Sequence, residues 1–124
     1  MSDPGKTAIV TGASQGIGAG IANGFVGRGF NVVANSRKMT QSTEVAASDQ
    51  VALVDGHIGE PATATKIVET ALSRFKSIDV LINNAGIFFT KPFTDYTAED
   101  FKSLVSTNVE GFLYITQLAI KQMC

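Results

Sequence analysis

The chain has 124 residues, of which 44% are hydrophobic and 17% are charged, which fits at most one globular domain. Its formal net charge of −1 provides no basic field, so we expect no nucleic-acid partner. No apolar run approaches the roughly 20 residues of a membrane helix, and the N-terminus has no apolar signal segment, so we expect a cytoplasmic protein without a membrane partner. The only cysteine, Cys124, excludes an internal disulfide.

A glycine-rich turn lies between the first expected strand, residues 6–11, and the first expected helix, residues 16–27. Its glycines follow the spacing G-x-x-x-G-x-G and are Gly12, Gly16 and Gly18. A helix N-terminus exposes unpaired N–H groups and a partial positive charge, so a pyrophosphate is stabilised there. Glycine lets the backbone approach such a group because it has no Cβ. The turn therefore predicts an anion site, although a tight strand-to-helix loop without a ligand has the same glycines.

Apolar runs and helical patterns continue to alternate along the chain. Further strands are expected at residues 31–35, 51–54 and 80–83, and a helix at residues 61–75. Residues 38–50 predict only a short helix, because they lack an apolar stripe. Apolar strands that alternate with helices indicate a parallel sheet covered on both faces. Right-handed crossovers then give a doubly wound, Rossmann-like α/β sheet with strand order 3-2-1-4.

Residues 97–100 have the pattern of a capping box that opens a last helix. We expect its apolar face to be buried and to consist of Phe101, Leu104, Val105, Phe112, Ile115 and Ala119. Asn108 falls on the same face. A buried amide without partners costs about 1–3 kcal/mol, so Asn108 needs a partner, a water molecule or a function. A structural alternative is a helix kink near Gly111.

Two motifs give the chain a family resemblance. The residues from Thr11 to Gly18 resemble the T-G-x-x-x-G-x-G of the short-chain dehydrogenase/reductase family. Asn83-Asn84-Ala85-Gly86 resembles the N-N-A-G that follows the fourth strand in that family. The resemblance covers the whole chain but only about the first half of a family member. It implies that residues 1–124 form the N-terminal, dinucleotide-binding portion of one such domain, truncated and incomplete relative to the family fold.

The resemblance implies a nicotinamide cofactor site on the turns that follow the strands. Its expected residues are Gly12, Ser14, Gln15, Gly16, Ile17, Gly18, Asn35, Ser36, Arg37, His57, Ile58, Asn84, Ala85 and Gly86. A carboxylate after the second strand binds the ribose 2′-hydroxyl of NAD, whereas an arginine there accommodates the 2′-phosphate of NADP. This chain has Ser36-Arg37-Lys38 and no acid at that place, so we expect NADP rather than NAD. The alternative is that Arg37 and Lys38 are a solvated loop pair.

His57 departs from the family pattern, in which an aspartate and an apolar residue follow the third strand near the adenine. His57-Ile58 falls at that place, and Asp55 lies two residues early. The imidazole could stack on the adenine or form a hydrogen bond with it, or it could be exposed to solvent. No nucleophile pattern and no metal-ligand spacing accompanies it, so we expect neither a catalytic role nor a metal site.

The resemblance implies hydride transfer between the nicotinamide and a carbonyl or alcohol substrate, including 3-oxo compounds. A serine, a tyrosine and a lysine four residues after the tyrosine carry the family's acid–base chemistry. The two tyrosines here, Tyr96 and Tyr114, are followed at that distance by Asp100 and Leu118. We therefore expect this chain alone to be inactive, while the parent protein is an oxidoreductase. Asn108 resembles the asparagine that holds a water molecule in the family's proton relay.

Other interpretations remain open at this point. The chain could be a non-catalytic dinucleotide-binding module, complete at this length, or an inactive fragment; the coding sequence after Cys124 would distinguish them. The absence of G-x-x-x-x-G-K-[ST] excludes a P-loop ATPase. Phe88, Phe89 and Phe93 could line a substrate pocket or belong to the core. We expect a homo-oligomer, or the missing C-terminal half, to cover the edge strand and the last helix.

Overall fold

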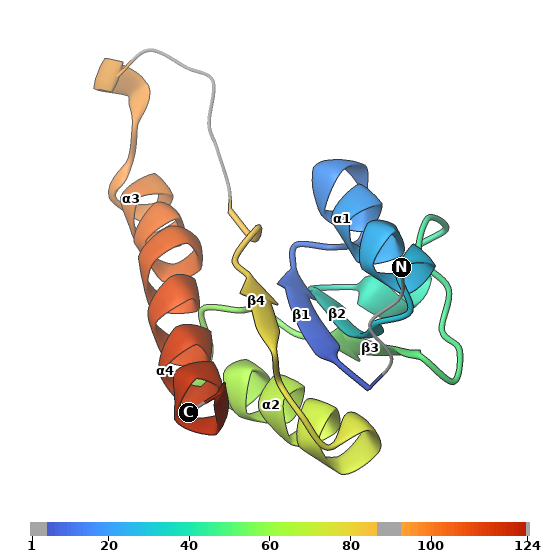
Figure 1. Cartoon of the computed structure of the whole chain (residues 1–124). Coiled ribbons are helices and arrows are strands. Elements are labelled where there is room, and N and C mark those ends of the chain that lie inside the picture. The colour runs from blue at the N-terminus through green and yellow to red at the C-terminus, as the bar shows by residue number, and fades with distance from the viewer. Residues whose placement is uncertain (1–4, 87–92, 124) are drawn as a thin grey trace.

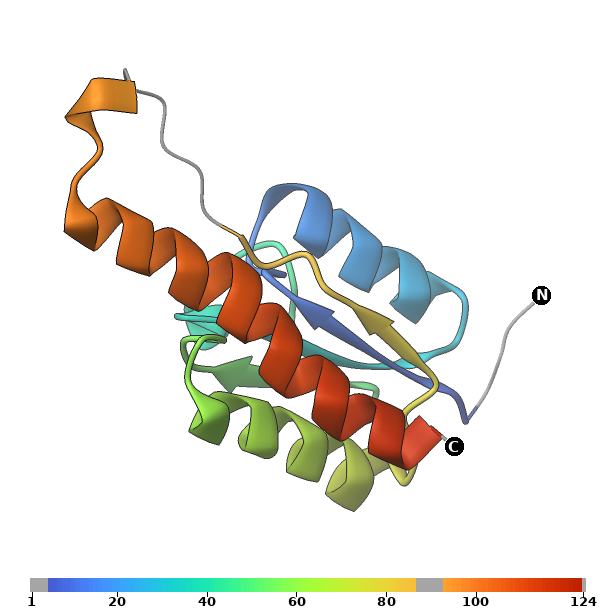
Figure 2. The same ribbon diagram turned by 90° about the vertical axis from the view of Figure 1, so that its left-hand side faces the viewer.

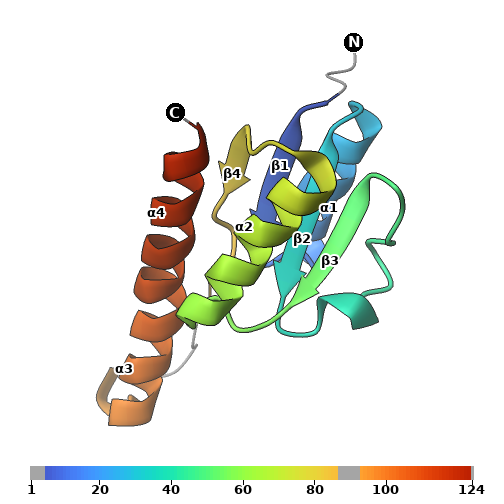
Figure 3. The same cartoon turned by 90° about the horizontal axis from the view of Figure 1, so that it is seen from below.

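The computed structural model describes residues 5–86 and 93–123 and contains a four-stranded parallel sheet (Figure 1). The strands lie in the predicted order β3-β2-β1-β4, with β4 at an edge (Figure 3). Their bounds are Thr7–Thr11 for β1, Asn31–Ser36 for β2, Val51–Asp55 for β3 and Val80–Ile82 for β4. The predicted strands differ from these by one residue at one end of each.

Helices cover both faces of the sheet, as predicted for a doubly wound, Rossmann-like fold. Helix α1 (Gly16–Gly27) lies on one face, and α2 (Pro61–Phe75) and α4 (Gly111–Met123) lie on the other (Figure 2). Alternate residues of β1 enter two separate cores: Ala8 and Val10 pack on the α1 side, and Ile9 packs on the α2 side. Both faces of β1 and β2 are therefore buried, which explains their continuous apolar runs.

The last helix begins with the predicted capping box. The Asp100 amide donates to Thr97 Oγ1 at 3.1 Å, and the Thr97 amide donates to an Asp100 carboxylate oxygen at 3.0 Å. Helix α3 (Ala98–Val105) continues through a π-helical turn, Ser106–Glu110, into α4. The helix is therefore continuous but changes its winding in the middle, next to Gly111.

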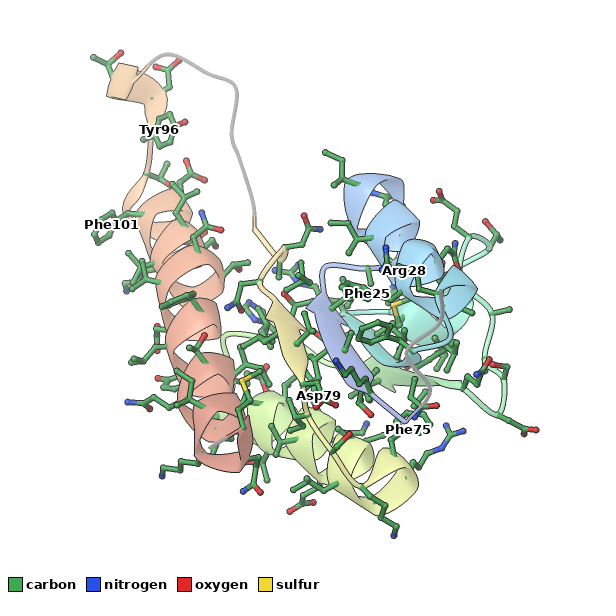
Figure 4. All side chains as sticks on the ribbon, viewed as in Figure 1. Phe25, Arg28, Phe75, Asp79, Tyr96 and Phe101 are labelled. Atoms are coloured by element: carbon green, nitrogen blue, oxygen red, sulfur yellow. The ribbon has the colours of Figure 1, made fainter. Side chains whose placement is uncertain are left out.

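The prediction that all of this helix's apolar stripe is buried is wrong. Phe101 is 65% exposed and Phe112 is 53% exposed, and Figure 4 shows Phe101 on the outer side of α3. The buried positions instead recur at every fourth residue and are Thr107, Gly111, Ile115 and Ala119. A π turn contains more residues than an α turn, so positions before and after it do not share one 3.6-residue stripe. Moreover, α4 packs against α2, whereas α3 extends beyond the sheet.

The expected short helix within residues 38–50 is reduced to a single 3₁₀ turn, Met39–Gln41. Polar side chains satisfy the backbone here in place of a helix. The Thr40 amide donates to the Asp55 carboxylate at 2.8 Å, and the Ser42 hydroxyl donates to the Ser14 carbonyl at 2.6 Å. Serine and threonine compete with helical hydrogen bonds in this way.

The predicted roles of three phenylalanines cannot be compared with the described residues. Phe88 and Phe89 lie outside the described residues, as does the side chain of Phe93, so their predicted roles stay predictions. Within residues 5–86 and 93–123, no helix combines the length and apolar character needed to cross a membrane.

Gly18 offers a direct stability test because α1 sits against the end of β1 at this residue. A Cβ on Gly18 would collide with the Gly12 carbonyl and lie 2.5 Å from the side-chain nitrogen Nδ2 of Asn84. We expect Gly18→Ala to lower the free energy of unfolding by about 1–3 kcal/mol, the usual cost of overpacking. Gly20, on the same helix, has nothing within 4 Å of its Cβ position.

Gly20→Ala is therefore the matched control, and it should raise the free energy of unfolding by about 0.5–1 kcal/mol through helix propensity. Chemical denaturation of both variants measures the difference. Equal effects of the two substitutions would contradict the close packing described for Gly18.

Candidate functional site

The glycine turn presents an open helix N-terminus. Gly16 opens α1 with a φ of 59°, a left-handed value that favours glycine, and nothing lies within 4 Å of its Cβ position. Gln15, at the N-cap, makes no side-chain capping hydrogen bond. Ile17 is 78% exposed. This turn therefore leaves space and backbone N–H groups at the positive end of the helix dipole.

The turn after β1 is bonded to the turn after β4. Thr11 Oγ1 accepts hydrogen bonds from the amides of Asn84 and Ala85 at 3.1 and 3.0 Å. The side-chain amide of Asn84 donates to the Gly12 carbonyl at 3.0 Å. A Cβ on Gly12 would lie 2.8 Å from the Ala85 Cα. The two sequence motifs that gave the resemblance are thus in direct contact, and the Asn84 side chain positions one against the other.

Asn35 binds together the turns that follow β1, β2 and β3. Its buried side-chain amide donates to the carbonyls of Val54 and Gly56 at 2.9 and 3.2 Å. The backbone carbonyl of Asn35 accepts a hydrogen bond from the Ala13 amide at 3.0 Å. The next residue, Ser36, has a buried hydroxyl with no hydrogen-bond partner among the described residues.

These turns enclose a pocket at the carboxyl ends of the strands. It is lined by Gly12, Asn35, Ser36, Arg37, Gly56, His57, Ile58, Ala85, Gly86 and Thr107. All except Gly56 and Thr107 are among the predicted cofactor residues. The other predicted residues of the turn, 14–18, and Asn84 do not line this pocket. Residues 14–18 occupy the adjoining glycine turn, and Asn84 joins that turn to the exit of β4.

Sequence reasoning missed two lining residues, which carried different signals. Gly56 follows β3 directly and has a φ of 148°, and its position after a strand could have identified it. Thr107 begins the buried four-residue stripe of the last helix. A regular helix would place the neighbouring Asn108 on the buried face, as predicted, but with the π turn the buried residue is Thr107.

Asn108 lies beside the site but is not buried, so that part of the prediction is wrong. It is on the π turn and lines a second pocket with Thr11, Ile58, Asn83, Ala85, Gly111 and Phe112. A Cβ on Gly86 would lie 3.1 Å from the Asn108 side-chain oxygen. The helix contains the π turn next to Gly111, and such turns are found frequently at functional sites. The alternative of a helix kink near Gly111 stays a prediction.

The π turn packs against the residues that follow β3. A Cβ on Gly111 would lie 2.6 Å from a methyl carbon of Ile58. A Cβ on Gly59 would collide with the Ser106 side chain. The wall formed by His57 and Ile58 is therefore fixed against the last helix.

Asp55 holds the backbone between β2 and β3. One carboxylate oxygen accepts from the Thr40 amide at 2.8 Å, and the other accepts from the Thr40 hydroxyl at 2.7 Å. These two hydrogen bonds hold the pKa of Asp55 below its usual value, and the bond from the Thr40 amide has the larger effect. The carboxylate consequently fixes the turn that begins with Arg37.

The Tyr114 side chain bonds to another residue of the last helix and does not line the pocket. Its hydroxyl donates to the Glu110 carboxylate at 2.7 Å, and this bond raises the pKa of the Tyr114 phenol. Among the described residues, no three His, Cys, Asp or Glu side chains gather in a way that could hold a metal ion.

The family described as short chain dehydrogenase matches residues 6–124. An NADP-dependent (R)-specific alcohol dehydrogenase of Lentilactobacillus kefiri is 36% identical, over 96% of this chain and 49% of its own length. The chain thus spans about half the length of the curated relatives it matches.

Solved structures share the fold. A 3-ketoacyl-(acyl-carrier-protein) reductase from Brucella melitensis, complexed with NADH, has a TM-score of 0.90 and 34% identity and covers 96% of this chain and 50% of its own. A short chain dehydrogenase from Burkholderia cenocepacia J2315, in complex with NADP, has a TM-score of 0.88 and 27% identity, over 97% of this chain and 51% of its own.

The Asp55 bonds predict an acid-dependent contribution to stability. Because the folded-state pKa of Asp55 is lowered, the contribution is fully present above the unfolded-state value, about 3.9, and is lost as the pH falls through the folded-state pKa. We expect Asp55→Asn to lower the thermal unfolding midpoint at pH 7 and to have a smaller effect near pH 3.

Asp49→Asn is the matched control, because Asp49 is exposed and lies in the same segment of the chain. Thermal unfolding of both variants across this pH range tests the assignment. Equal midpoints for the two variants at pH 7 would contradict it.

Proposed function

Because the chain belongs to the short-chain dehydrogenase/reductase family, we propose that it carries the cofactor site of an NADP-dependent oxidoreductase. The observation that carries the proposal is the pocket at the carboxyl ends of the strands, which adjoins the open N-terminus of α1. In open α/β sheets, ligands bind at this edge, where the strand order reverses. Here the reversal lies between β1 and β4, whose exits are bonded through Thr11 and Asn84.

The pyrophosphate of the dinucleotide is proposed to bind at the glycine turn. Gly12, Ser14, Gln15, Gly16, Ile17 and Gly18 form this turn, and the N–H groups of the first turn of α1 would donate to the phosphate oxygens. The open space at Gly16 fits a group that needs close approach of the backbone. Ala85, which packs against Gly12, and Gly86, which lies beside Asn108, are proposed to contact the nicotinamide half.

The pocket residues also fit such a ligand chemically. Ser36 Oγ and Thr107 Oγ1 are buried polar atoms without a partner among the described residues, and both residues line the pocket. Buried polar groups are normally hydrogen-bonded, so each of these atoms calls for an explanation. A bound nucleotide would supply the missing partners.

The 2′-phosphate of NADP is proposed to bind at the end of β2. The Ser36 hydroxyl there has no hydrogen-bond partner within the described part of the chain, and Arg37 is exposed and lines the same pocket. A guanidinium binds phosphate in a bidentate fashion, and no carboxylate follows β2 to favour the 2′-hydroxyl of NAD. The NADP-dependent alcohol dehydrogenase relative supports this preference, although one structural neighbour was solved with NADH.

The reaction proposed for the whole protein is hydride transfer with a carbonyl or alcohol substrate. The bound cofactor supplies or accepts the hydride. Two relatives are an alcohol dehydrogenase and a 3-ketoacyl reductase, which supports this class and includes 3-oxo compounds within it. Asn108, beside Gly86, is proposed to hold a water molecule of the proton relay.

The exposed apolar side chains of the last helix are proposed to pack against another copy or against further residues of the parent protein. They are Phe101, Val109, Phe112, Leu113, Ile120 and Met123. Neither tyrosine of this chain has a lysine four residues later. The tyrosine and lysine of the acid–base chemistry are therefore proposed to lie outside residues 1–124.

Arg37 provides the test of cofactor preference. We expect Arg37→Ala to weaken NADPH binding by about tenfold to a hundredfold, the worth of a hydrogen bond to a charged group, and to leave NADH binding nearly unchanged. Titration of the chain with each reduced cofactor, followed by nicotinamide fluorescence, measures both affinities.

Arg28→Ala is the matched control, because it removes the same charge at the opposite end of α1 (Figure 4). It should change neither affinity. Equal affinity of the unsubstituted chain for NADPH and NADH would disprove the NADP preference.

A second prediction concerns turnover. Residues 1–124 should bind NADPH without oxidising it when mixed with a panel of ketones, aldehydes and 3-oxo esters, because the tyrosine–lysine pair is not among them. The measurement is cofactor absorbance over time. Sustained oxidation that depends on the carbonyl compound would show that the chain already contains the groups needed for the reaction.

A further inference from the structure

Carbonyl groups of the glycine turn are held by side chains from outside the turn. The side-chain amide of Asn84 donates to the Gly12 carbonyl at 3.0 Å, and the Ser42 hydroxyl donates to the Ser14 carbonyl at 2.6 Å. The Gln15 side chain, at the N-cap of α1, makes no capping hydrogen bond. The peptide between Ser14 and Gln15 is therefore constrained by a residue 28 positions later in the chain.

Ser42 is itself held by the loop in which it lies. Its Oγ accepts hydrogen bonds from the amides of Glu44 and Val45 at 3.1 and 3.3 Å, so its one hydrogen is left for the Ser14 carbonyl. Val45 is buried, as is Met39, and both pack in the same core as side chains of α1. The loop therefore presents the Ser42 hydroxyl to the glycine turn from a fixed position.

This loop is also bonded to two neighbouring elements. The Asn23 side-chain amide, on α1, donates to the Glu44 carbonyl at 2.8 Å. The Asp55 carboxylate, at the end of β3, accepts from the amide and hydroxyl of Thr40. Residues 39–45 are thus joined to α1 on one side and to β3 on the other.

The bond from Ser42 determines which way the Ser14–Gln15 peptide faces. A trans peptide directs its carbonyl oxygen and its N–H in opposite directions, and the described residues contain no cis peptide bond. Because the Ser14 carbonyl points to Ser42, the Gln15 N–H points away from the loop. The negative end of this peptide is thereby kept from turning toward an anion at the start of α1.

Resting on the proposed function, we propose that Ser42 is a positioning residue for the diphosphate of the dinucleotide. Its hydroxyl holds the Ser14–Gln15 peptide in the orientation that leaves the N–H groups at the start of α1 to the phosphate oxygens. Without this bond the turn populates other orientations, and the apparent affinity falls with the fraction of molecules that remain competent. NADPH and NADH both carry the diphosphate, so Ser42 acts equally on the two, whereas Arg37 acts on the 2′-phosphate alone.

Ser42→Ala tests this role with NADPH, with NADH and with adenosine 2′-phosphate, which has no diphosphate. We expect both reduced cofactors to bind about threefold to tenfold more weakly, the worth of a neutral hydrogen bond, with their affinity ratio unchanged. The affinity for adenosine 2′-phosphate should change by less than about twofold, because Ser36 and Arg37 remain. Nicotinamide fluorescence measures the reduced cofactors, and amide NMR measures adenosine 2′-phosphate.

Thr43→Ala is the matched control, because Thr43 is the exposed neighbour of Ser42, and it should change none of the affinities. Ser42→Thr keeps the hydroxyl and should restore the binding of both cofactors. Arg37→Ala should give the opposite pattern, with loss of adenosine 2′-phosphate and NADPH but not of NADH. A purely structural role of Ser42 would not separate the ligands in this way.

A second variant covers the case in which Ser42→Ala does not fold. Ser42→Cys nearly keeps the size of the side chain, but its thiol is a weak donor, so it should also weaken both reduced cofactors. The carbonyl carbon shift of Ser14 should change in this variant and in Ser42→Ala, and stay constant in Thr43→Ala.

The outcomes separate this inference from the proposed function. Failure of the unsubstituted chain to bind either reduced cofactor would overturn the proposed function and the inference together. Binding by the unsubstituted chain, with unchanged NADH affinity in Ser42→Ala or with an equal loss for adenosine 2′-phosphate, would overturn the inference alone.

Discussion

The backbone at Gly12 leaves no room for a side chain at Gly18, and the backbone of Asn84 and Ala85 leaves none at Gly12. The helix α1 enters directly against the Gly12 carbonyl, and the Asn84 amide donates to that same carbonyl. Three elements, β1, α1 and the exit of β4, are thereby held against one another. The rest of the site depends on this contact, because it determines where the open N-terminus of α1 points.

The pocket is formed by polar bonds between turns rather than by any single element. Thr11, Asn35 and Asp55 each link a strand end to a neighbouring turn. Parallel strands bring all of these turns to one edge of the sheet, so residues far apart in the chain meet there. The last wall comes from the π turn, which Gly111 allows to approach the loop after β3.

Local patterns were sufficient to predict most of the fold. The glycine spacing, the apolar runs and the Thr97–Asp100 capping box all act through neighbouring residues, so the sequence displays them directly. The π turn has no comparable local signature. The helix that continues from it, α4, packs against α2, and its first residue, Gly111, lies against Ile58. The exposure of Asn108 and the burial of Thr107 depend on that turn. A regular 3.6-residue projection therefore predicted the wrong residue of this pair for the buried position.

The central claim is that a dinucleotide binds through the backbone amides at the start of α1. Amide NMR of the isotope-labelled chain, titrated with NADPH, tests it most directly. The account predicts that the largest shifts occur at the amides of residues 16–18, with further shifts at Ser36, Arg37 and Thr107. Shifts confined to the groove around Phe25 and Arg28 at the other end of α1, or no shifts at millimolar cofactor, would contradict it.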